Sequence, residues 1–308
     1  MMRVLFMGTP EISALCLKRL LDDGHNVVGV VTREDKPRGR KMIMTPTETK
    51  ALAEERGIEV VTPPSLRTPE FAEYLACVAP DIIVVVAFGK ILPKSVLDFA
   101  PFGAVNLHVS LLPKFRGAAP MQRAIMAGES ETGVTVMYMD EGLDTGDIVA
   151  VEKFPIKPDD DFEAVYNKSC EIGSALLSRT LTEIFEGRAT RTPQNHAEAS
   201  YAAKIEKADA KIDFTRPARE LDFMIRGVTP IPGAFAYLGG RMLKICRAVP
   251  TDKSGAPGEV ISTDGGKILV GCGEGALEIL SVIPEGKGKM SAADFIRGRK
   301  IFKGDILE

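Results

Sequence analysis

Largely apolar runs that alternate with helical segments are the feature of the first half of the sequence that most constrains its fold. Residues 3–7, 27–32, 81–86 and 104–107 form such runs, and they are rich in β-branched residues. Strands that are apolar on both faces are typical of parallel sheets with helices on both sides. The sequence therefore predicts a doubly wound α/β domain with a mostly parallel, Rossmann-like sheet, which binds ligands at the carboxyl ends of its strands.

Helical periodicity separates these strands. Between residues 11 and 23, Ile12, Leu15, Cys16 and Leu20 recur at a spacing that indicates one face of a helix. Further helices are expected at residues 46–56, 94–99 and 160–186, a short strand at 59–61, an apolar segment at 133–139 and a loop at 33–46.

The last part of the chain has a different pattern, with short apolar segments separated by turns that are rich in glycine and proline. Gly239-Gly240 is a strong signal for a two-residue hairpin turn, and Ser291 followed by Asp294 resembles a helix start. Five short strands and one helix predict a small OB-like β-barrel. We therefore expect a first domain at residues 1–188, a linker at 189–208 and the barrel domain at 209–308. The five strands are expected at residues 234–238, 241–248, 258–262, 267–270 and 277–282.

The composition is that of an ordinary soluble globular protein, with 45% hydrophobic and 26% charged residues among 308. No apolar run approaches the roughly 20 residues that a membrane span requires, and the N-terminus lacks the sections of a signal peptide. The five cysteines are scattered and predict reduced thiols in a cytoplasmic protein, with no metal site. The net charge is −3, but residues 209–308 hold 15 basic and 13 acidic residues, a net of +2, which favours this part as the one that faces a polyanion.

A glycine-containing turn follows the first strand, where a dinucleotide-binding protein carries G-x-G-x-x-G. Here Gly8 is followed by Pro10 and Ser13 at the places of the second and third glycines. A proline at that place cannot supply the run of backbone N–H groups that cradles a pyrophosphate. The sequence therefore argues against NAD binding.

Asn106 and His108 are the sharpest candidates for a reacting centre. Strand alternation points both side chains to the same face, at the carboxyl end of an expected central strand. An amide N–H can stabilise the oxygen that becomes negative during acyl transfer, and an imidazole can relay the proton lost by an attacking amine. The alternative is a buried polar pair satisfied by backbone groups, which explains the two residues at least as well when they are taken alone.

A carboxylate for this centre is expected from the acidic loop at residues 140–147. Two glycines in the loop allow it to bring a side chain into a tight space. Asp144 suits an inward-facing position better than Asp140 or Asp147, and beside His108 it would fix the imidazole tautomer and raise its basicity. A turn rich in acidic residues, or a cation loop, is the alternative, although the spacing fails the EF-hand pattern.

Several motifs together resemble those of the folate-dependent formyltransferases. The segment 106–113 (Asn-Leu-His-Val-Ser-Leu-Leu-Pro), with its continuation 114–120, is similar to one signature of that family, and 142–147 (Gly-Leu-Asp-Thr-Gly-Asp) to a second. Residues 6–10 and 86–93 add further matches, so the resemblance covers essentially the whole chain. It implies transfer of the formyl group of 10-formyltetrahydrofolate to methionine esterified to initiator tRNA, with an OB-like domain that contacts the tRNA.

Carried over residue by residue, the resemblance implies site residues of two kinds. Asn106, His108 and Asp144 match the family's catalytic residues. The residues implied to contact the folate are Phe88, Gly89, Ile91 and Leu92 in one segment, and Ser110, Leu111, Leu112 and Pro113 in the other.

Basic residues in two places are expected to contact tRNA. Five basic and two acidic residues lie at 33–41, and the resemblance implies that this loop reaches the acceptor end of the tRNA; a solvated surface loop is the alternative. Lys41 stands where the family usually has a glycine, and Ile231 where it often has a tryptophan. In the barrel domain a basic wall would hold the RNA backbone. The expected contacts are Arg38, Arg40 and Lys41 in the loop, and Lys287, Lys289, Arg297 and Arg299 in the barrel domain.

Other functions remain open from the sequence. The same formyl chemistry serves other amines, such as nucleotide sugars or glycinamide ribonucleotide, and a related hydrolase uses water as the acceptor. The similarity of the purine enzyme is expected to stop before a barrel domain. A non-catalytic α/β module that binds nucleotide or RNA belongs to a different class and would not need Asn106, His108 and Asp144 to converge. A monomer that binds tRNA is our expectation.

Overall fold

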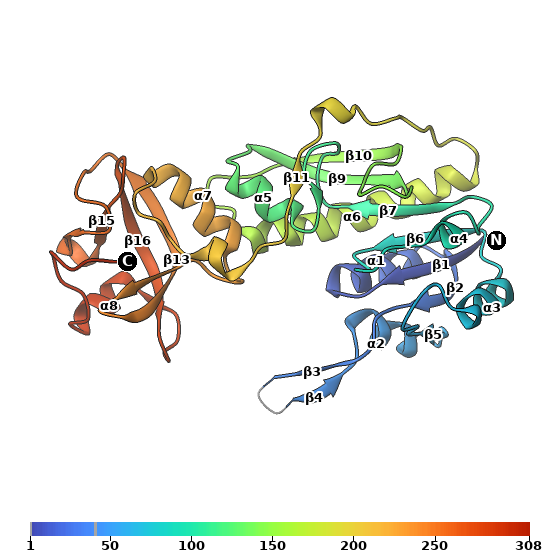
Figure 1. Cartoon of the computed structure of the whole chain (residues 1–308), viewed down its shortest axis with the longest axis horizontal. Coiled ribbons are helices and arrows are strands. Elements are labelled where there is room, and N and C mark those ends of the chain that lie inside the picture. The colour runs from blue at the N-terminus through green and yellow to red at the C-terminus, as the bar shows by residue number, and fades with distance from the viewer. Residues whose placement is uncertain (1, 40–41) are drawn as a thin grey trace. The chain divides into compact units, whose positions relative to one another are not determined.

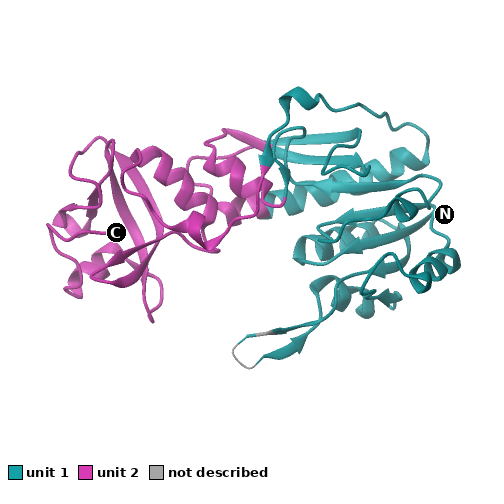
Figure 2. Cartoon of the chain, in the orientation of Figure 1, with its two compact units in different colours: residues 1–117, 133–154, 167–201 teal, residues 118–132, 155–166, 202–308 magenta. Residues whose placement is uncertain are grey.

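The computed structural model describes residues 2–39 and 42–308. The chain forms two compact units, each made of several stretches of the sequence (Figure 2). The first unit consists of residues 1–117, 133–154 and 167–201, and the second of residues 118–132, 155–166 and 202–308. Among the described helices, none is both long and apolar enough to cross a membrane.

The first unit is built around a seven-stranded sheet in the order β10-β9-β7-β6-β1-β2-β5 (Figure 1). The strands from β5 to β7 run parallel, whereas β9 is antiparallel to β7. The expected doubly wound, mostly parallel sheet is therefore confirmed. The strands are β1 (Arg3–Gly8), β2 (Asn26–Val31), β5 (Val60–Val61), β6 (Ile82–Val86), β7 (Ala104–His108), β9 (Glu131–Tyr138) and β10 (Ile148–Pro155).

Helices cover this sheet with their apolar faces. Phe71 of α3 and Val96 of α4 belong to one buried cluster with Leu5 of β1 and Ile83 of β6. Neither α3 nor β10 was expected, whereas the other helices lie within two residues of their predicted bounds. The helices are α1 (Glu11–Asp22), α2 (Glu48–Glu55), α3 (Pro69–Val78), α4 (Lys94–Leu97) and α6 (Phe162–Phe185).

The buried face of α1 differs in one residue from the predicted one. Ile12, Cys16 and Leu20 are buried, but Leu15 is 40% exposed. Burial raises the pKa of the Cys16 thiol well above its usual range. A thiol that stays protonated is a poor nucleophile and metal ligand, so Cys16 has the structural role that its place on the helix suggested.

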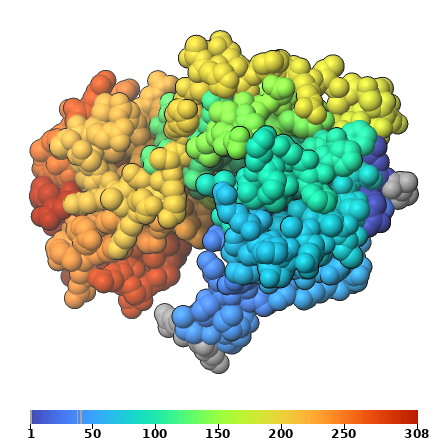
Figure 3. All heavy atoms as spheres, turned by 45° about the vertical axis from the view of Figure 1, so that its right-hand side comes forward, coloured from blue at the N-terminus to red at the C-terminus, as the bar shows by residue number. Residues whose placement is uncertain are grey.

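The region 33–46 contains a β-hairpin where a loop was expected. β3 (Lys36–Arg38) pairs antiparallel with β4 (Ile43–Thr45), and the hairpin projects away from the sheet of the first unit (Figures 1 and 3). The apolar side chains of Ile43 and Met44 are each 61% exposed. Because backbone pairing forms these strands without burying an apolar face, no alternating pattern marks them in the sequence.

The second unit contains a curled antiparallel sheet in the order β12-β13-β16-β15-β14, with β17 paired to β16. The five expected strands and the OB-like architecture are confirmed. Leu307 pairs with Leu238 of β12, and Ile306 with Glu259 next to β14, so the end of the chain bridges the two edges of the sheet. The strands are β12 (Phe235–Leu238), β13 (Arg241–Thr251), β14 (Val260–Ser262), β15 (Ile268–Gly271), β16 (Ala276–Pro284) and β17 (Met290–Ser291).

The second unit has more helices than the single one expected. α8 (Ala292–Arg297) begins as predicted, since the Ser291 hydroxyl accepts a hydrogen bond from the Asp294 N–H. In addition, α7 (Ala218–Val228) packs against α5 (Pro120–Met126). A Cβ on Gly227 would lie only 2.6 Å from the Met126 Cγ, so the glycine allows the two helices to approach closely.

Candidate active site

Asn106 and His108 lie at the carboxyl end of β7, and strand alternation places them on one face. β7 is an interior strand between β6 and β9, so both residues are buried, with exposed fractions of 9% and 6%. The Asn106 amide makes no hydrogen bond with any other described residue. Its N–H groups are therefore available to a bound reactant.

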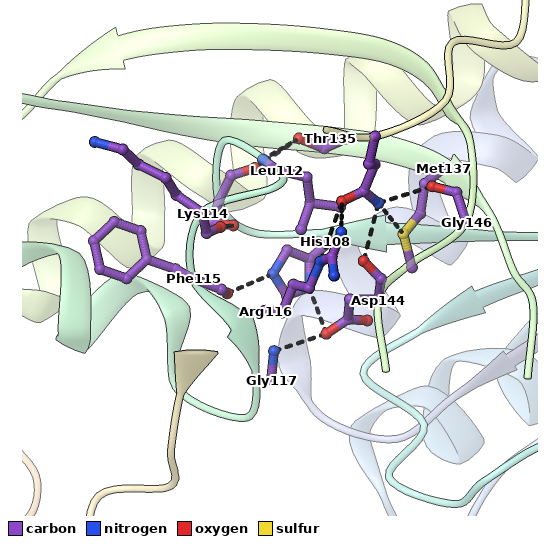
Figure 4. Close-up of polar contacts among 12 residues, drawn as sticks. His108, Leu112, Lys114, Phe115, Arg116, Gly117, Thr135, Met137, Asp144 and Gly146 are labelled. Atoms are coloured by element: carbon purple, nitrogen blue, oxygen red, sulfur yellow. Dashed lines mark hydrogen bonds and ion pairs between the residues drawn. The ribbon is translucent and has the colours of Figure 1, made fainter. Parts of the chain in front are cut away.

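The two ring nitrogens of His108 face different partners (Figure 4). Nε2 lies 2.9 Å from the carbonyl oxygen of Phe115. Because a carbonyl oxygen can only accept, Nε2 carries the proton of this hydrogen bond. Nδ1 lies 3.6 Å from Oδ2 of Asp144, which is too long for a good hydrogen bond, and the two groups attract each other by charge only when the imidazole is protonated. We expected Asp144 to fix the tautomer, but the Phe115 carbonyl does so instead.

Asp144 is held by the backbone of a neighbouring segment. Its Oδ2 accepts a 2.8 Å hydrogen bond from the Gly117 N–H. Its φ of 53° lies in the left-handed region, which residues other than glycine seldom adopt. By contrast, Asp140 closes its own loop, where Oδ1 accepts from the Gly142 N–H and the Thr145 hydroxyl. The structure therefore brings Asp144, rather than Asp140, next to His108.

The segment at residues 110–117 holds both members of this pair through its backbone, since Phe115 contacts His108 and Gly117 contacts Asp144. The Ser110 hydroxyl fixes the turn from within, donating to the Lys114 carbonyl oxygen at 2.7 Å. The Ser110 carbonyl oxygen in turn accepts a 2.7 Å hydrogen bond from the Thr135 hydroxyl of β9. The segment that supplies the partners of His108 and Asp144 is thus anchored to β9 of the sheet.

The residues expected to contact folate occupy different environments. Phe88 and Leu92 are core residues, 2% and 5% exposed, whereas Ile91 is 86% exposed. Gly89 has a φ of 76°, which a residue with a side chain rarely adopts. Of the four residues expected to contact folate in this segment, Ile91 is therefore the one with an exposed apolar side chain. In the second segment Ser110 and Leu112 are buried, and Leu111 and Pro113 are half-buried.

A cavity of about 460 Å³ lies outside this group of residues. It is lined by β5, α3 and the turn between them, including Val61, Phe71 and Tyr74, and by none of the candidate catalytic or folate-contacting residues. The Lys90 ammonium group donates to the carbonyl oxygen of Pro63 at its edge, at 2.6 Å. The candidate site is therefore defined by its convergent polar groups and not by this cavity.

Sequence reasoning missed two residues of the centre. Arg116 is only 2% exposed, and its guanidinium donates to the Oε1 of Gln194. Gln194, in the segment expected to be a linker, also contacts the backbone of Asp144. Arg116 lies inside the 114–120 motif, which could have drawn attention to it. Nothing in the sequence around Gln194 connects it with Asp144.

The expected tRNA contacts are distributed over both units. Arg38 belongs to β3, and Arg40 and Lys41 lie outside the described residues. The four residues of the barrel domain are all exposed, and Arg297 is paired with Asp294 on α8. These four are Lys287, Lys289, Arg297 and Arg299.

Comparisons with known proteins give a consistent result along the chain. Residues 2–181 match the formyl transferase family model, and residues 204–300 match the model of the formyl transferase C-terminal domain. A methionyl-tRNA formyltransferase from Geotalea uraniireducens is 44% identical over 306 residues, which cover 99% of this chain and 98% of that one. Another from Myxococcus xanthus is 47% identical over 302 residues, covering 98% and 96%.

A solved structure adds a likeness of fold. The crystal structure of HypX from Aquifex aeolicus in complex with tetrahydrofolic acid matches all of this chain and 50% of that one, with a TM-score of 0.65 and 21% identity. The family models and the full-length relatives together decide the assignment. The chain belongs to the formyl transferase family.

Proposed function

We propose that the chain transfers the formyl group of 10-formyltetrahydrofolate to the α-amino group of methionine carried by initiator tRNA. The observation that carries this proposal is the His108–Asp144 pair, which lies at the end of β7 with the Asn106 amide. Acyl transfer to an amine needs a donor to the oxygen and an acceptor for the proton, and these residues supply both. The match to methionyl-tRNA formyltransferases over nearly the full length supports the acceptor.

The roles of the three residues follow from their contacts. 10-Formyltetrahydrofolate supplies the formyl group, and Asn106 donates to the formyl oxygen as the amine adds and the oxygen gains negative charge. His108 takes the amine proton on Nδ1, because Nε2 already donates to Phe115. Asp144 then stabilises the imidazolium from 3.6 Å. The proton passes to the folate nitrogen when its bond to the formyl carbon breaks.

His108 acts in this scheme as a proton relay. The free α-amino group has an ordinary pKa of about 8, so a neutral fraction exists at pH 7 without a strong base. The larger tasks are holding the amine against the formyl carbon and stabilising the oxygen. In this division of labour Asn106 stabilises the formyl oxygen and His108 moves the proton.

For the folate, we propose contacts with the segments 88–92 and 110–113. Ile91 is the exposed apolar side chain of the first segment, and the turn at Gly89 presents backbone groups beside it. In the second segment the Ser110 hydroxyl is engaged with Lys114. Ser110 therefore supports the shape of the segment, while Leu111 and Pro113 offer the partly exposed surface.

For the tRNA, we propose contacts with the β3–β4 hairpin, including Arg38, Arg40 and Lys41, and with the exposed basic residues of the barrel domain. Phosphate groups attract exposed lysine and arginine irrespective of sequence. We also propose a monomer in the cytoplasm, and five free cysteines fit such a reducing compartment. Sedimentation equilibrium at a mass near 33.3 kDa tests the monomer.

One assay separates the proposed acceptor from its rivals. Purified protein is incubated with formyl-labelled 10-formyltetrahydrofolate and, in parallel, with methionyl initiator tRNA, free methionine, glycinamide ribonucleotide, a nucleotide amino sugar or no amine. We expect label only in the methionyl-tRNA. Label in another amine would show that this amine is the acceptor, and release of formate without an amine would show that water is. No turnover with any acceptor would favour a non-catalytic binding module.

A further inference from the structure

Gln194 engages every hydrogen-bonding group of its side chain at the centre of the site. Nε2 donates to the carbonyl oxygens of Asp144 at 2.9 Å and Gly146 at 2.7 Å. Oε1 accepts from Nε of Arg116 at 3.2 Å and from Nη2 at 2.7 Å. Because guanidinium can only donate and carbonyls can only accept, these partners also fix which end of the amide is oxygen. Gln194 therefore joins two segments through one rigid, 7% exposed group.

On one side, Gln194 holds the loop that carries Asp144. The left-handed φ of Asp144 is a conformation that surrounding contacts must maintain. Gly146 is pressed against β9 so closely that a Cβ there would collide with the carbonyl oxygen of Tyr138. Gln194 thus holds the backbone of this loop at two carbonyl groups, while Gly117 holds the Asp144 carboxylate.

On the other side, Gln194 holds Arg116, the residue between the two backbone partners of the catalytic pair. Phe115 accepts from His108, and Gly117 donates to Asp144. The buried guanidinium of Arg116 has Gln194 and the Nδ1 of His196 as its partners, and no described carboxylate lies within ion-pair distance of it. The neutral amide oxygen is thus a main acceptor for this buried cation.

We propose that Gln194 is a positioning residue for formyl transfer. It ties the Asp144 loop to the segment 115–117 and so sets the separation between Nδ1 of His108 and Oδ2 of Asp144. This inference rests on the proposed function, because its kinetic test measures the rate of formyl transfer. Because Gln194 is buried and contacts neither Asn106 nor the exposed basic residues, its loss acts on turnover and not on substrate binding.

The decisive pair of variants is Gln194→Glu and Asn195→Asp. Both turn an amide into an acid and add one negative charge at adjacent positions. In Gln194→Glu the new carboxylate can still accept the hydrogen bonds of Arg116. It has no N–H to donate to the carbonyl oxygens of Asp144 and Gly146, so only the hydrogen bonds to the loop are lost. Asn195 is exposed and bonds only within its own turn, to Ala197 and Glu198.

We expect Gln194→Glu to lower kcat at least about tenfold, because small displacements of catalytic groups are costly. KM for the folate and for the tRNA should stay within about twofold, and Asn195→Asp should resemble wild type. The proposal would be overturned if Gln194→Glu left kcat unchanged or raised only KM, or if Gln194→Glu and Asn195→Asp lowered kcat equally. If Gln194→Glu melts far below Asn195→Asp, Gln194→Asn takes its place, since its amide is one methylene too short to reach both segments.

A second readout does not depend on catalysis. The Gly117 N–H is bonded to the Asp144 carboxylate, whereas the adjacent Arg116 N–H is bonded to the backbone oxygen of Ser200 at 2.8 Å. In Gln194→Glu we expect amide hydrogen exchange at Gly117 to quicken at least about tenfold, with exchange at Arg116 unchanged. Unchanged exchange at Gly117 would overturn the positioning role. A wild-type protein that formylates no methionyl-tRNA would overturn the proposed function instead, while this measurement still decides the role of Gln194.

Discussion

The buried centre around His108 and the exposed basic residues of the barrel domain use polar groups in opposite ways. At the centre, Asp144 and Gln194 are held by hydrogen bonds to groups 27 and 50 residues away in the sequence, and His108 by the backbone of Phe115, seven residues away. In the barrel domain, residues such as Lys287 and Arg299 are exposed, and the tRNA contacts that we propose for them rest on charge. Water and salt screen the second kind of group but barely reach the first. The centre therefore depends on geometry, and the basic surface on the number of charges.

The largest effect is expected from the centre itself. Asn106→Ala and His108→Ala should each reduce turnover at least about a hundredfold, because one removes the donor to the formyl oxygen and the other the proton relay. Steady-state kinetics at saturating substrates measures the loss, with the circular dichroism spectrum as a control for folding. Turnover close to wild type in either folded variant would show that the buried pair is only structural.

The basic surface should respond more gradually. Replacing Lys287, Lys289, Arg297 and Arg299 together by glutamine should raise KM for tRNA about tenfold or more and leave kcat and KM for folate near wild type. The plot of log KM against log salt should lose about one unit of slope for each residue that contacts a phosphate. A loss of kcat with an unchanged salt slope would mean that these residues act through their position, like those around His108, and not through their charge.

A single charge on the hairpin should give a smaller effect. Arg40→Ala is expected to raise KM for charged tRNA several-fold and to flatten its dependence on ionic strength by about one unit. The measurement is KM for tRNA at several salt concentrations in the variant and in wild type. Coinciding curves would mean that the hairpin does not contact tRNA and that its charges only face solvent.

The smallest effect is expected from His25, which is half-buried and has no part in the site. Burial lowers its pKa, against the opposing charge of Asp23. Its Nε2 lies 3.0 Å from the Ser178 hydroxyl, which itself donates to Asp23. Because the folded-state pKa lies below the unfolded value of about 6.5, the folded state binds fewer protons, and stability falls as the pH drops through about 6.5.

A pH series of melting temperatures checks this expectation. Between about pH 7.5 and pH 5.5, wild type should lose slightly more stability than His25→Gln, which has no group that titrates there. Equal losses would mean that protonation of His25 is not coupled to folding. The formyl transfer rate of the variant at pH 7.5 should match wild type, since burial by itself does not make a group catalytic.

The elements that were predictable are those whose burial is visible in the sequence. Residues 4–7 of β1 and 82–86 of β6 are almost completely buried on both faces, and they form continuous apolar runs. α7 was also within reach, because Leu221, Met224, Ile225 and Val228 lie at helical spacing. The β3–β4 hairpin was not, because Ile43 and Met44 are exposed and their pairing leaves no periodic pattern.

The candidate site likewise has features that could be predicted from the sequence and features that could not. That Asn106 and His108 share a face follows from the period of a strand, and the glycines around Asp144 indicated a loop that could reach them. The partner that holds the imidazole proton could not be predicted, because it is the backbone carbonyl of Phe115 and not a side chain. Gln194 could not be predicted either, since it lies 50 residues from Asp144 and 78 from Arg116 along the chain.

The sequence by itself thus determined the sheet, the barrel and the chemical types of the groups that meet at the end of β7. The tertiary structure alone decided which tautomer the imidazole adopts and which distant residue fixes the Asp144 loop. The physical reason is that periodic patterns report burial, which accumulates over many residues of one element. A hydrogen bond depends on the position of two particular atoms, and only the folded chain brings them together.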